Sequence, residues 1–286
     1  MNETLRTVDG SSVLRMERRF AHRPEKIWRA LTEPAHLAQW FPSQVELDLR
    51  VGGTVKFVFA GGEAPPSDGV ISELDPPRVF AFTWNGDLLH WELRPEGQGT
   101  LLILTHTFAD RPAAASYGAG WHACLDAMET ALDGRPAEPG EDWAERHEAF
   151  VAEFGLAEGT AEATAEGWRV RFERQLTRPV AEAWTALTGG TTPVVGAEPP
   201  TSATIDPIAA GMVTAVTAPT LLEYESRTDD RAEGRVRWEL RDGNGGARLV
   251  LIQTGPGDGA DAQSPVLAAW RTHIERLAAR LHAGGE

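Results

Sequence analysis

The sequence has a single cysteine, Cys124, among its 286 residues. One cysteine cannot form an intrachain disulfide, and it excludes a CxxC metal or redox site. The spacings HxxxH, HExxH and GxSxG are also missing, which argues against a zinc site and a serine-hydrolase centre. No apolar run approaches the ~18 residues of a membrane span, and residues 1–10 are too polar for a signal peptide. We therefore expect no metal, no cofactor and a cytoplasmic location.

Basic residues are also scarce, and the formal net charge is −15. A nucleic-acid binder needs a basic face, so this class of partner is not expected. Lys26 and Lys56 are the only lysines, and the bias toward Arg, Ala, Gly and Pro is typical of a GC-rich bacterial genome. Hydrophobic residues make up 42% and charged residues 24% of the chain, as in globular proteins of about two domains.

What the sequence does contain is an internal repeat. Three blocks of sequence recur in the same order, and each block contains a tryptophan at a matching position in both copies. The matching ranges are 17–32 with 173–188, 91–104 with 238–251, and 121–132 with 270–281. Tryptophan is rare, so three recurring tryptophans at similar separations indicate a tandem duplication of one fold.

An acidic segment separates the two copies. Residues 135–166 hold nine Asp or Glu and two Arg. Asp142 and Glu145 fit a capping box, and Gly155 fits a helix stop, so this segment predicts a helix with one apolar face that docks on a domain. We expect a first domain over 1–138, an acidic helical connector over 139–162 and a second domain over 163–286. The charges are read as a solvated helix face, with a partner-binding role as the alternative.

Each copy predicts an α+β domain. In the first copy we expect an opening strand over 13–21, a helix that begins at Pro24, a short helix over 34–40, and a long closing helix over 113–132. Six strands lie between the helices, over 45–49, 54–60, 69–74, 78–84, 88–94 and 100–108. Sequential antiparallel strands with helices on one face indicate a curved sheet wrapped on the long helix, with space for a cavity between them.

Large side chains of the first copy converge on the inner face of this sheet. Period-2 alternation places Phe57 and Phe59 on one face, as it does Phe82 and Trp84. Each ring alone is better explained as core than as ligand wall, but together they predict an apolar ligand cavity. The residues assigned to it are Trp40, Phe57, Phe59, Phe82, Trp84, Trp91, Leu104, His106, Phe108, Trp121 and Leu125. His106 is the polar member, read either as a satisfied interior histidine or as an anchor for a ligand. We assign no catalytic residue.

These residues resemble the START-like (SRPBCC) superfamily of helix-grip proteins, and within it the group related to the C-terminal domain of the Hsp90 ATPase activator. The resemblance rests on Arg23 to Thr32, Trp40-Phe41-Pro42, Val51 to Thr54, and Ile71 to Trp84, and it continues through Thr100 to Phe108 and Gly120-Trp121. It implies a helix-grip fold whose cavity takes a hydrophobic small molecule.

The second copy departs from this pattern. It lacks a counterpart of Trp40-Phe41-Pro42, and Ser226, Arg248 and Gln253 stand at the positions of Trp84, Leu101 and His106. We therefore expect the second copy to be a degenerate domain without a functional pocket.

Three functions remain open at this point. The first is non-catalytic binding of a small hydrophobic or aromatic molecule for carriage, sensing or sequestration. The second is a cyclase- or aromatase-like enzyme that uses His106 as acid or base, for which the sequence shows no carboxylate partner. The third, implied by the resemblance alone, is a co-chaperone interaction of the Hsp90 type. A regulatory or structural tandem without a ligand is the remaining alternative.

Overall fold

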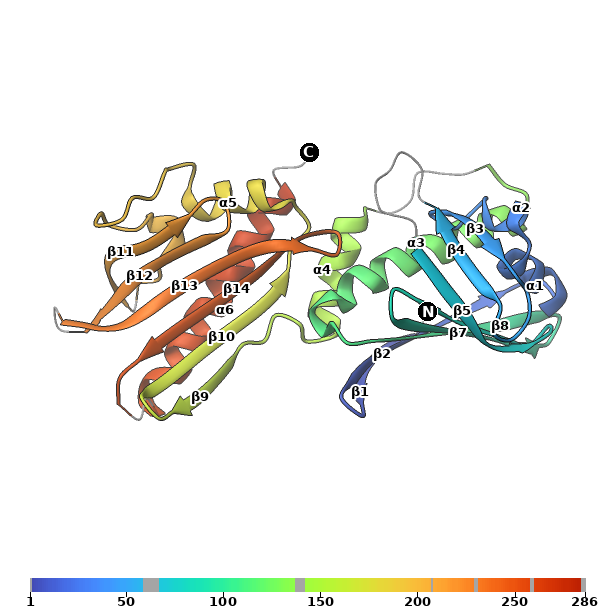
Figure 1. Cartoon of the computed structure of the whole chain (residues 1–286), viewed down its shortest axis with the longest axis horizontal. Helices are drawn as coiled ribbons and strands as arrows, with labels where there is room; N and C mark the ends of the chain where they lie inside the picture. The colour runs from blue at the N-terminus through green and yellow to red at the C-terminus, as the bar shows by residue number, and fades with distance from the viewer. Residues whose placement is uncertain are drawn as a thin grey trace. The chain divides into compact units, whose positions relative to one another are not determined.

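The computed structural model describes residues 2–58, 67–136, 142–206, 208–228, 231–257 and 260–283 (Figure 1). The chain divides into two compact units, Met1–Arg146 and His147–Glu286, which are described separately here. We refer to them as the first and the second unit.

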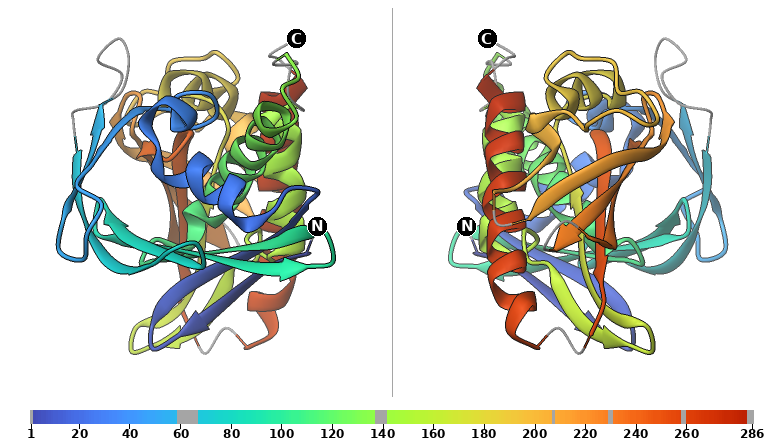
Figure 2. Two further views of the ribbon diagram at one scale, coloured as in Figure 1. Left: turned by 90° about the vertical axis from the view of Figure 1, so that its right-hand side faces the viewer. Right: turned by 90° about the vertical axis from the view of Figure 1, so that its left-hand side faces the viewer.

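The first unit is one antiparallel sheet of eight strands in the order β1-β2-β8-β7-β6-β5-β4-β3. Its elements are β1 (Asn2–Val8), β2 (Ser11–Phe20), α1 (Pro24–Thr32), α2 (Pro34–Leu37), β3 (Gln44–Leu47), β4 (Thr54–Val58), β5 (Ser67–Asp75), β6 (Val79–Trp84), β7 (Asp87–Glu96), β8 (Gly99–Phe108) and α3 (Ala114–Leu132). The three helices lie on the same side of the bent sheet (Figure 2). The predicted fold class is confirmed.

The second unit repeats this plan with fewer strands, in the order β11-β12-β13-β14-β10-β9. Its elements are β9 (Thr160–Thr164), β10 (Gly167–Gln175), α5 (Val180–Thr188), β11 (Ala209–Thr217), β12 (Leu221–Thr228), β13 (Arg231–Gly243), β14 (Gly246–Gly255) and α6 (Ala260–Ala283). Among the described residues of this unit, β3 and β4 have no counterpart, and residues 189–206 form a loop with one 3₁₀ turn, Thr201–Ala203, in their place.

Strand register confirms that the repeats are equivalent. Trp91 pairs with Leu104 on β8, and Trp238 pairs with Leu251 on β14. Two residues earlier on the first strand of each pair, Leu89 faces His106 and Val236 faces Gln253. His106 and Gln253, which the sequence comparison matched, therefore occupy equivalent positions in the two folds.

In each unit, a cationic side chain near the start of the first helix donates a hydrogen bond to a carbonyl oxygen at the C-terminal end of the long helix. Lys26 Nζ donates to the carbonyl oxygen of Leu132 at 2.5 Å, and Arg178 Nε donates to that of Leu281 at 3.1 Å. A positive group at a helix C-terminus satisfies a free carbonyl and favours the helix dipole. Both units therefore have such a contact, although the two cations stand at different positions of the repeat: Lys26 within α1, and Arg178 two residues before α5.

The helix expected between the copies is α4 (Trp143–Glu153). The Asp142 carboxylate accepts a hydrogen bond from the Ala144 backbone N–H at 2.9 Å, as an N-cap does. Gly155 has a φ of 62°, the left-handed conformation of a helix stop. Phe150, Val151 and Phe154 are buried, so the predicted apolar face is present. The domain boundaries at 138 and 162 stay a prediction.

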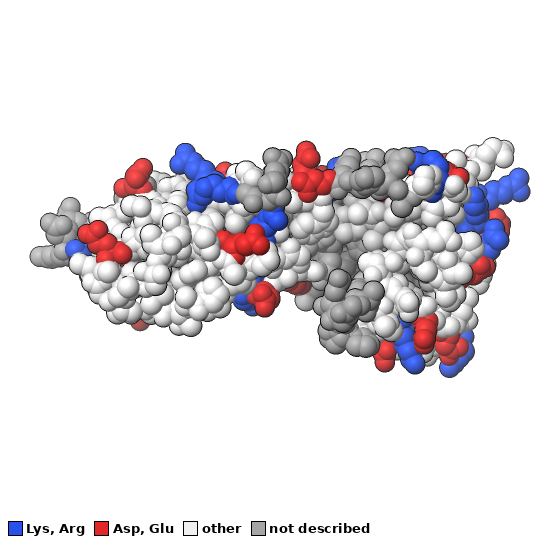
Figure 3. All heavy atoms as spheres, turned by 90° about the horizontal axis from the view of Figure 1, so that it is seen from above, with Lys and Arg blue, Asp and Glu red and all other residues white. Residues whose placement is uncertain are grey.

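Charged side chains of both signs are intermixed over the surface seen in Figure 3, so the net negative charge does not gather into one patch on that face. None of the described helices is long and apolar enough to cross a membrane.

Candidate functional site

The residues assigned to the cavity meet in the interior of the first unit. Of the eleven, Phe59 lies outside the described residues. Nine of the remaining ten are buried, and Trp84 is partly exposed. They come from the segment after α2, from strands β4, β6, β7 and β8, and from helix α3. The sequence pattern thus identified which side chains face inward.

The aromatic rings in this interior pack against one another. Phe57 stacks on Trp84 with ring centroids 4.7 Å apart, and Trp91 meets Trp121 edge-on at 5.4 Å. Trp40 also meets Trp91 edge-on, at 6.1 Å. Edge-to-face and offset pairs at these distances are favourable. The rings fill most of the space that the sequence led us to expect as an open cavity.

A small cavity of about 10 Å³ remains beside these rings. That volume is about enough for one water molecule, whereas pockets for drug-sized ligands measure ~300–1,000 Å³. The expected site residues that line it are Trp40, Phe57, Phe82 and Trp91. The other lining residues are Leu31, Leu37, Phe41, Val45, Leu47, Val55 and Phe80.

The lining differs from the expected set on one side. Trp84, Leu104, His106, Phe108, Trp121 and Leu125 are not part of the cavity wall. The wall extends instead toward α1, α2 and β3, which supply Leu31, Leu37 and Val45. Phe41 could have been found from the sequence, because it belongs to the Trp40-Phe41-Pro42 motif that carried the resemblance. The aliphatic members carried no comparable signal.

His106 is buried and forms hydrogen bonds at both ring nitrogens. Trp121 Nε1 donates to His106 Nδ1 at 3.2 Å, and His106 Nε2 lies 3.0 Å from Asp87 Oδ2. An indole N–H can only donate, so Nδ1 accepts and Nε2 carries the proton that is donated to the Asp87 carboxylate. The histidine is therefore held in one tautomer, between a buried ring and a partly exposed carboxylate.

Asp87 corrects the expectation that His106 has no carboxylate partner. It lies at the start of β7, directly after Asn85-Gly86, both of which have positive φ. In the sequence this Asn-Gly-Asp segment reads as a turn, and an aspartate in a turn is ordinary. Only the register of β7 against β8 brings it to a histidine 19 positions away.

Two other residues considered in this region play no visible part in the site. Burial raises the pKa of the Cys124 thiol to about 12, so it is not a nucleophile at neutral pH. His122 is buried, and its Nδ1 lies 3.1 Å from Asp126 Oδ2 on the next turn of α3.

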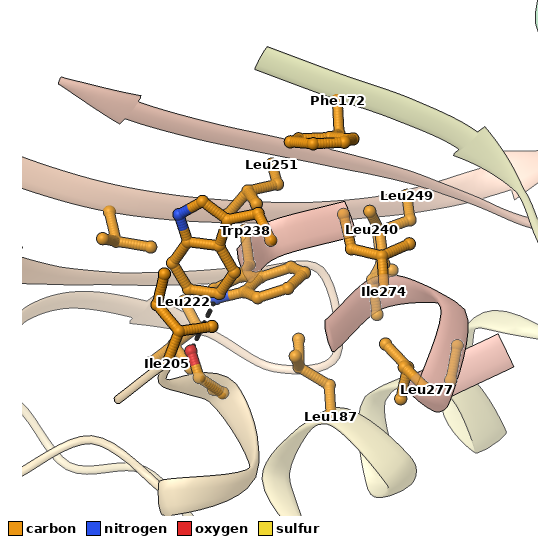
Figure 4. Packing of buried hydrophobic residues seen from close by; sticks show 14 of the residues in the cluster. Phe172, Leu187, Ile205, Leu222, Trp238, Leu240, Leu249, Leu251, Ile274 and Leu277 are labelled. Atoms are coloured by element: carbon orange, nitrogen blue, oxygen red, sulfur yellow. Dashed lines mark hydrogen bonds between the residues drawn. The ribbon is translucent and has the colours of Figure 1, made fainter. Parts of the chain in front are cut away.

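The interior of the second unit is a filled apolar core (Figure 4). Trp238, Trp270 and Tyr224 are almost completely buried. Trp238 Nε1 and the Tyr224 hydroxyl both donate to the carbonyl oxygen of Ala203, at 3.1 and 2.7 Å. This carbonyl belongs to the 3₁₀ turn in the loop that replaces β3 and β4.

A polar cluster of the second unit begins at Arg248, at the position of Leu101. Arg248 is 2% exposed and donates to Gln175 Oε1 at 3.0 Å and to Glu173 Oε1 at 3.1 Å. Burial raises the pKa of Glu173, but hydrogen bonds from Arg171 and Arg248 outweigh it, and the pKa is lowered overall. These hydrogen bonds and ion pairs link strands β10 and β14.

The second unit also has an open hollow of about 590 Å³, lined in part by Glu223, Arg235 and Arg237. The Glu223 carboxylate already accepts hydrogen bonds from Thr214 at 3.0 Å and from Arg237 at 3.1 Å. Glu223, Arg235 and Arg237 are thus paired with one another, and we assign no ligand to this hollow. The described residues contain no group of three or more His, Cys, Asp or Glu that could hold a metal ion.

A curved antiparallel sheet closed by a long C-terminal helix, present twice, defines the helix-grip class of proteins. The chain belongs to the family of Activator of Hsp90 ATPase homolog 1-like proteins, whose sequence model matches residues 21–133 and again 160–282. The resemblance seen in the sequence is therefore confirmed for both copies.

Single-domain structures are similar to one half of the chain. A conserved protein of unknown function from Enterococcus faecalis is 22% identical over 53% of this chain and 89% of its own, with a TM-score of 0.48. CalU16 from Micromonospora echinospora is 28% identical over 53% of this chain and 96% of its own, with a TM-score of 0.44. No curated protein matches the chain.

Proposed function

We propose that the first unit binds a small apolar or aromatic molecule in the cavity between its sheet and the segment of α1, α2, Trp40 and Phe41, without catalysing a reaction on it. The observation that carries this proposal is the small cavity of about 10 Å³, whose eleven lining residues are all aliphatic or aromatic. An apolar ligand gains free energy from such a wall in proportion to the area it buries.

The ligand must displace side chains to enter, because the present cavity is small. The part of the wall best suited to move is α2 and the residues after it. This helix has four residues, and Trp40 and Phe41 follow it. Trp40 is fixed through one side-chain hydrogen bond, from Nε1 to the carbonyl oxygen of Ala30 at 2.9 Å. Short elements with few such bonds open at low free-energy cost.

Thermal unfolding of the full chain with neutral aromatic compounds, fatty acids and polyketide-like compounds tests the proposal. A compound present at 100 times its Kd should stabilise the unit that binds it by about 2.7 kcal/mol. Hydrogen exchange then shows which unit is protected, and we expect α2 and β4 of the first unit.

Val45→Phe adds a ring at the cavity wall and should abolish this binding, at a cost of about 1–3 kcal/mol in stability. The matched control is Val70→Phe, the same change at a side chain that is 48% exposed. If no compound protects the first unit, or if both variants bind equally well, the proposal is wrong.

A second candidate is the cyclase-like enzyme, and Asp87 is the observation that favours it. A carboxylate that orients a histidine is a recurring feature of acid–base catalysis. However, Trp121 occupies Nδ1 and Asp87 occupies Nε2, so substrate must first displace one of them. His106→Gln keeps an acceptor for Trp121 and cannot transfer protons. It should abolish turnover of a polyketide-like substrate if this second function is correct, and leave ligand binding intact if the first is.

The cytoplasmic location expected from the sequence belongs to the same proposal, as does a small hydrophobic molecule as the partner. A chaperone partner rests on the family name alone, and a pull-down of the full chain with a bacterial Hsp90-type chaperone tests it.

A further inference from the structure

His106 can accept the hydrogen bond of Trp121 only while its ring is neutral. In the neutral ring Nδ1 has a lone pair, and Trp121 Nε1 donates to it at 3.2 Å. A second proton must be added to this same Nδ1, because Nε2 already carries the proton that it donates to Asp87 at 3.0 Å. Two N–H groups would then point at each other, so protonation of His106 breaks its bond to Trp121.

Among the groups around His106, the histidine itself is the one whose type titrates near neutral pH. Of the described residues, Asp87 of β7 and Tyr117 of α3 are the titratable side chains that face it. β2 presents Leu14 opposite His106, and Phe108 packs against the ring with centroids 4.9 Å apart. Carboxyl groups ordinarily titrate near pH 4 and phenols near pH 10, whereas histidine does so between about pH 5 and pH 8.

Trp121 connects this pair to the wall of the cavity. Its ring centroid lies 6.2 Å from that of Phe41 and 5.4 Å from that of Trp91, and both of these rings line the cavity. Trp121 and His106 are 5% and 3% exposed, so water does not replace the lost bond while the rings stay in place. A buried indole N–H that loses its acceptor is costly, and the cost is relieved when Trp121 turns away from His106. Phe41 and Trp91 then lose a ring that packs against them.

The second unit has the equivalent bond with an acceptor that does not titrate. Trp270, the equivalent of Trp121, donates to the side-chain oxygen of Gln253. An amide oxygen accepts a hydrogen bond at acid and at neutral pH alike. The titratable acceptor therefore stands in the unit with the aromatic cavity, and the amide stands in the unit with the filled core.

We propose that His106 is a pH-sensitive switch of the ligand site, in which protonation releases Trp121 and loosens the packing of Phe41 and Trp91. This inference rests on the proposed function and adds its regulation by pH. The bond to Trp121 is present at high pH and is lost as the pH falls. Because a ligand must displace side chains to enter, a proton that weakens their packing lowers the cost of binding. The affinity for the ligand should therefore rise as the pH falls, and bound ligand should favour the protonated ring in return.

The ¹⁵N-labelled indole signals of the full chain, followed from pH 8 to pH 5, test the switch without a ligand. The signal of Trp121, assigned by its loss in Trp121→Phe, should move upfield as its acceptor is lost. The signal of Trp270 is the internal control and should keep its position. In His106→Gln the amide oxygen replaces Nδ1, so the Trp121 signal should no longer depend on pH. Asp87→Asn removes a negative charge that favours a protonated histidine, so the change should occur at a lower pH.

The aromatic probe N-phenyl-1-naphthylamine, which stays neutral over this pH range, tests the effect on binding. We expect the full chain to bind it about tenfold more tightly at pH 5 than at pH 8, since one buried hydrogen bond is worth about this factor. His106→Gln should bind it equally well at both values of pH.

Two results would overturn the inference and leave the proposed function standing. One is a Trp121 signal that does not change with pH, or that changes equally in His106→Gln. The other is a Trp121 signal that responds while the affinity of the wild type for the probe stays constant. If neither this probe nor any compound of the thermal-unfolding panel binds, the proposed function is wrong and its regulation falls with it.

Discussion

His106 and Gln253 occupy equivalent positions, and each accepts a hydrogen bond from the equivalent tryptophan of the long helix, Trp121 or Trp270. The carboxylate differs as well. At the position of Asp87 the second unit has Gly234, where a Cβ would lie 2.1 Å from the Thr254 carbonyl oxygen. A side chain cannot fit there, so the second unit has neither a histidine nor a carboxylate at these two positions. What both units retain is an acceptor for the buried indole.

The first prediction follows from this equivalence. His106→Gln should destabilise the first unit little, because the amide oxygen can accept from Trp121 as Gln253 does from Trp270. His106→Leu leaves the buried indole N–H of Trp121 without a partner and should cost about 1–3 kcal/mol. Exchange of the Trp121 indole proton measures both, and equal effects of the two substitutions would contradict the role given to His106.

The second prediction concerns His273 on α6, whose Nε2 donates to the Ser202 carbonyl at 3.0 Å. Burial lowers its pKa, and the charges of Arg280 and Arg276 lower it further against the opposing effect of Ser202. In the unfolded chain the pKa of this histidine is about 6.5. Below that pH the unfolded chain therefore binds a proton at His273 more readily than the folded chain does. The stability of the second unit should fall as the pH drops below about 6.5.

His273→Gln should reduce this loss of stability between pH 7 and pH 5, as followed by hydrogen exchange of α6. The control is His282→Gln on the same helix, which should retain the full slope. A slope that is the same in wild type and in His273→Gln would show that another group is responsible.

At the residue level, the sequence predicted which side chains are buried and did not predict which of them touch. The alternation of Phe57, Phe82 and Trp91 placed all three inside, as the structure has them. The bond between Asp87 and His106 depends on the register of β7 against β8. That register is not encoded in the periodicity of a single strand.

The element that distinguishes the two units is the segment between the first helix and the fifth strand of the first unit. There it forms α2, β3 and β4, which supply Leu37, Val45 and Phe57 to the cavity wall. In the second unit the corresponding loop brings Ala203 to the core instead. The sequence predicted this difference, because the second copy lacks the Trp40-Phe41-Pro42 motif and has a Pro- and Gly-containing loop.

Two strands escaped prediction for a common reason. In β1 most described side chains are exposed or half-buried, and in β9 all five are exposed. Both are edge strands that pair with one neighbour only, β2 and β10. Without a buried face they lack the alternation that indicates a strand. The short helix predicted to reach Trp40 ends at Leu37, since Phe41 must turn inward to contact Phe57.

The third prediction is that the cation at the end of each long helix stabilises its last turn. Lys26→Met removes the donor to the Leu132 carbonyl, and Arg178→Met removes the donor to the Leu281 carbonyl. Each should cost about 1 kcal/mol and increase hydrogen exchange in the last turn of α3 or α6 respectively. Lys56→Met, on an exposed position of β4, is the control. A control that frays α3 as much as Lys26→Met does would contradict this role.

At the scale of the whole molecule, the two units share one fold but differ in how their cores are built. The second core satisfies its buried indoles with protein acceptors, including Ala203 and Gln253. The first concentrates aromatic rings, Trp91 among them, around a small cavity.

The fourth prediction compares the same substitution at equivalent tryptophans of the two units. Trp91→Phe and Trp238→Phe remove the same atoms from equivalent places, so the loss of packing should be similar in both. Only Trp238→Phe also removes a hydrogen bond, that to the Ala203 carbonyl. Without ligand it should therefore destabilise its unit by about 1 kcal/mol more than Trp91→Phe destabilises the other. Hydrogen exchange of the full chain reports each unit separately, and equal losses would mean that Trp91 has an acceptor in the free protein.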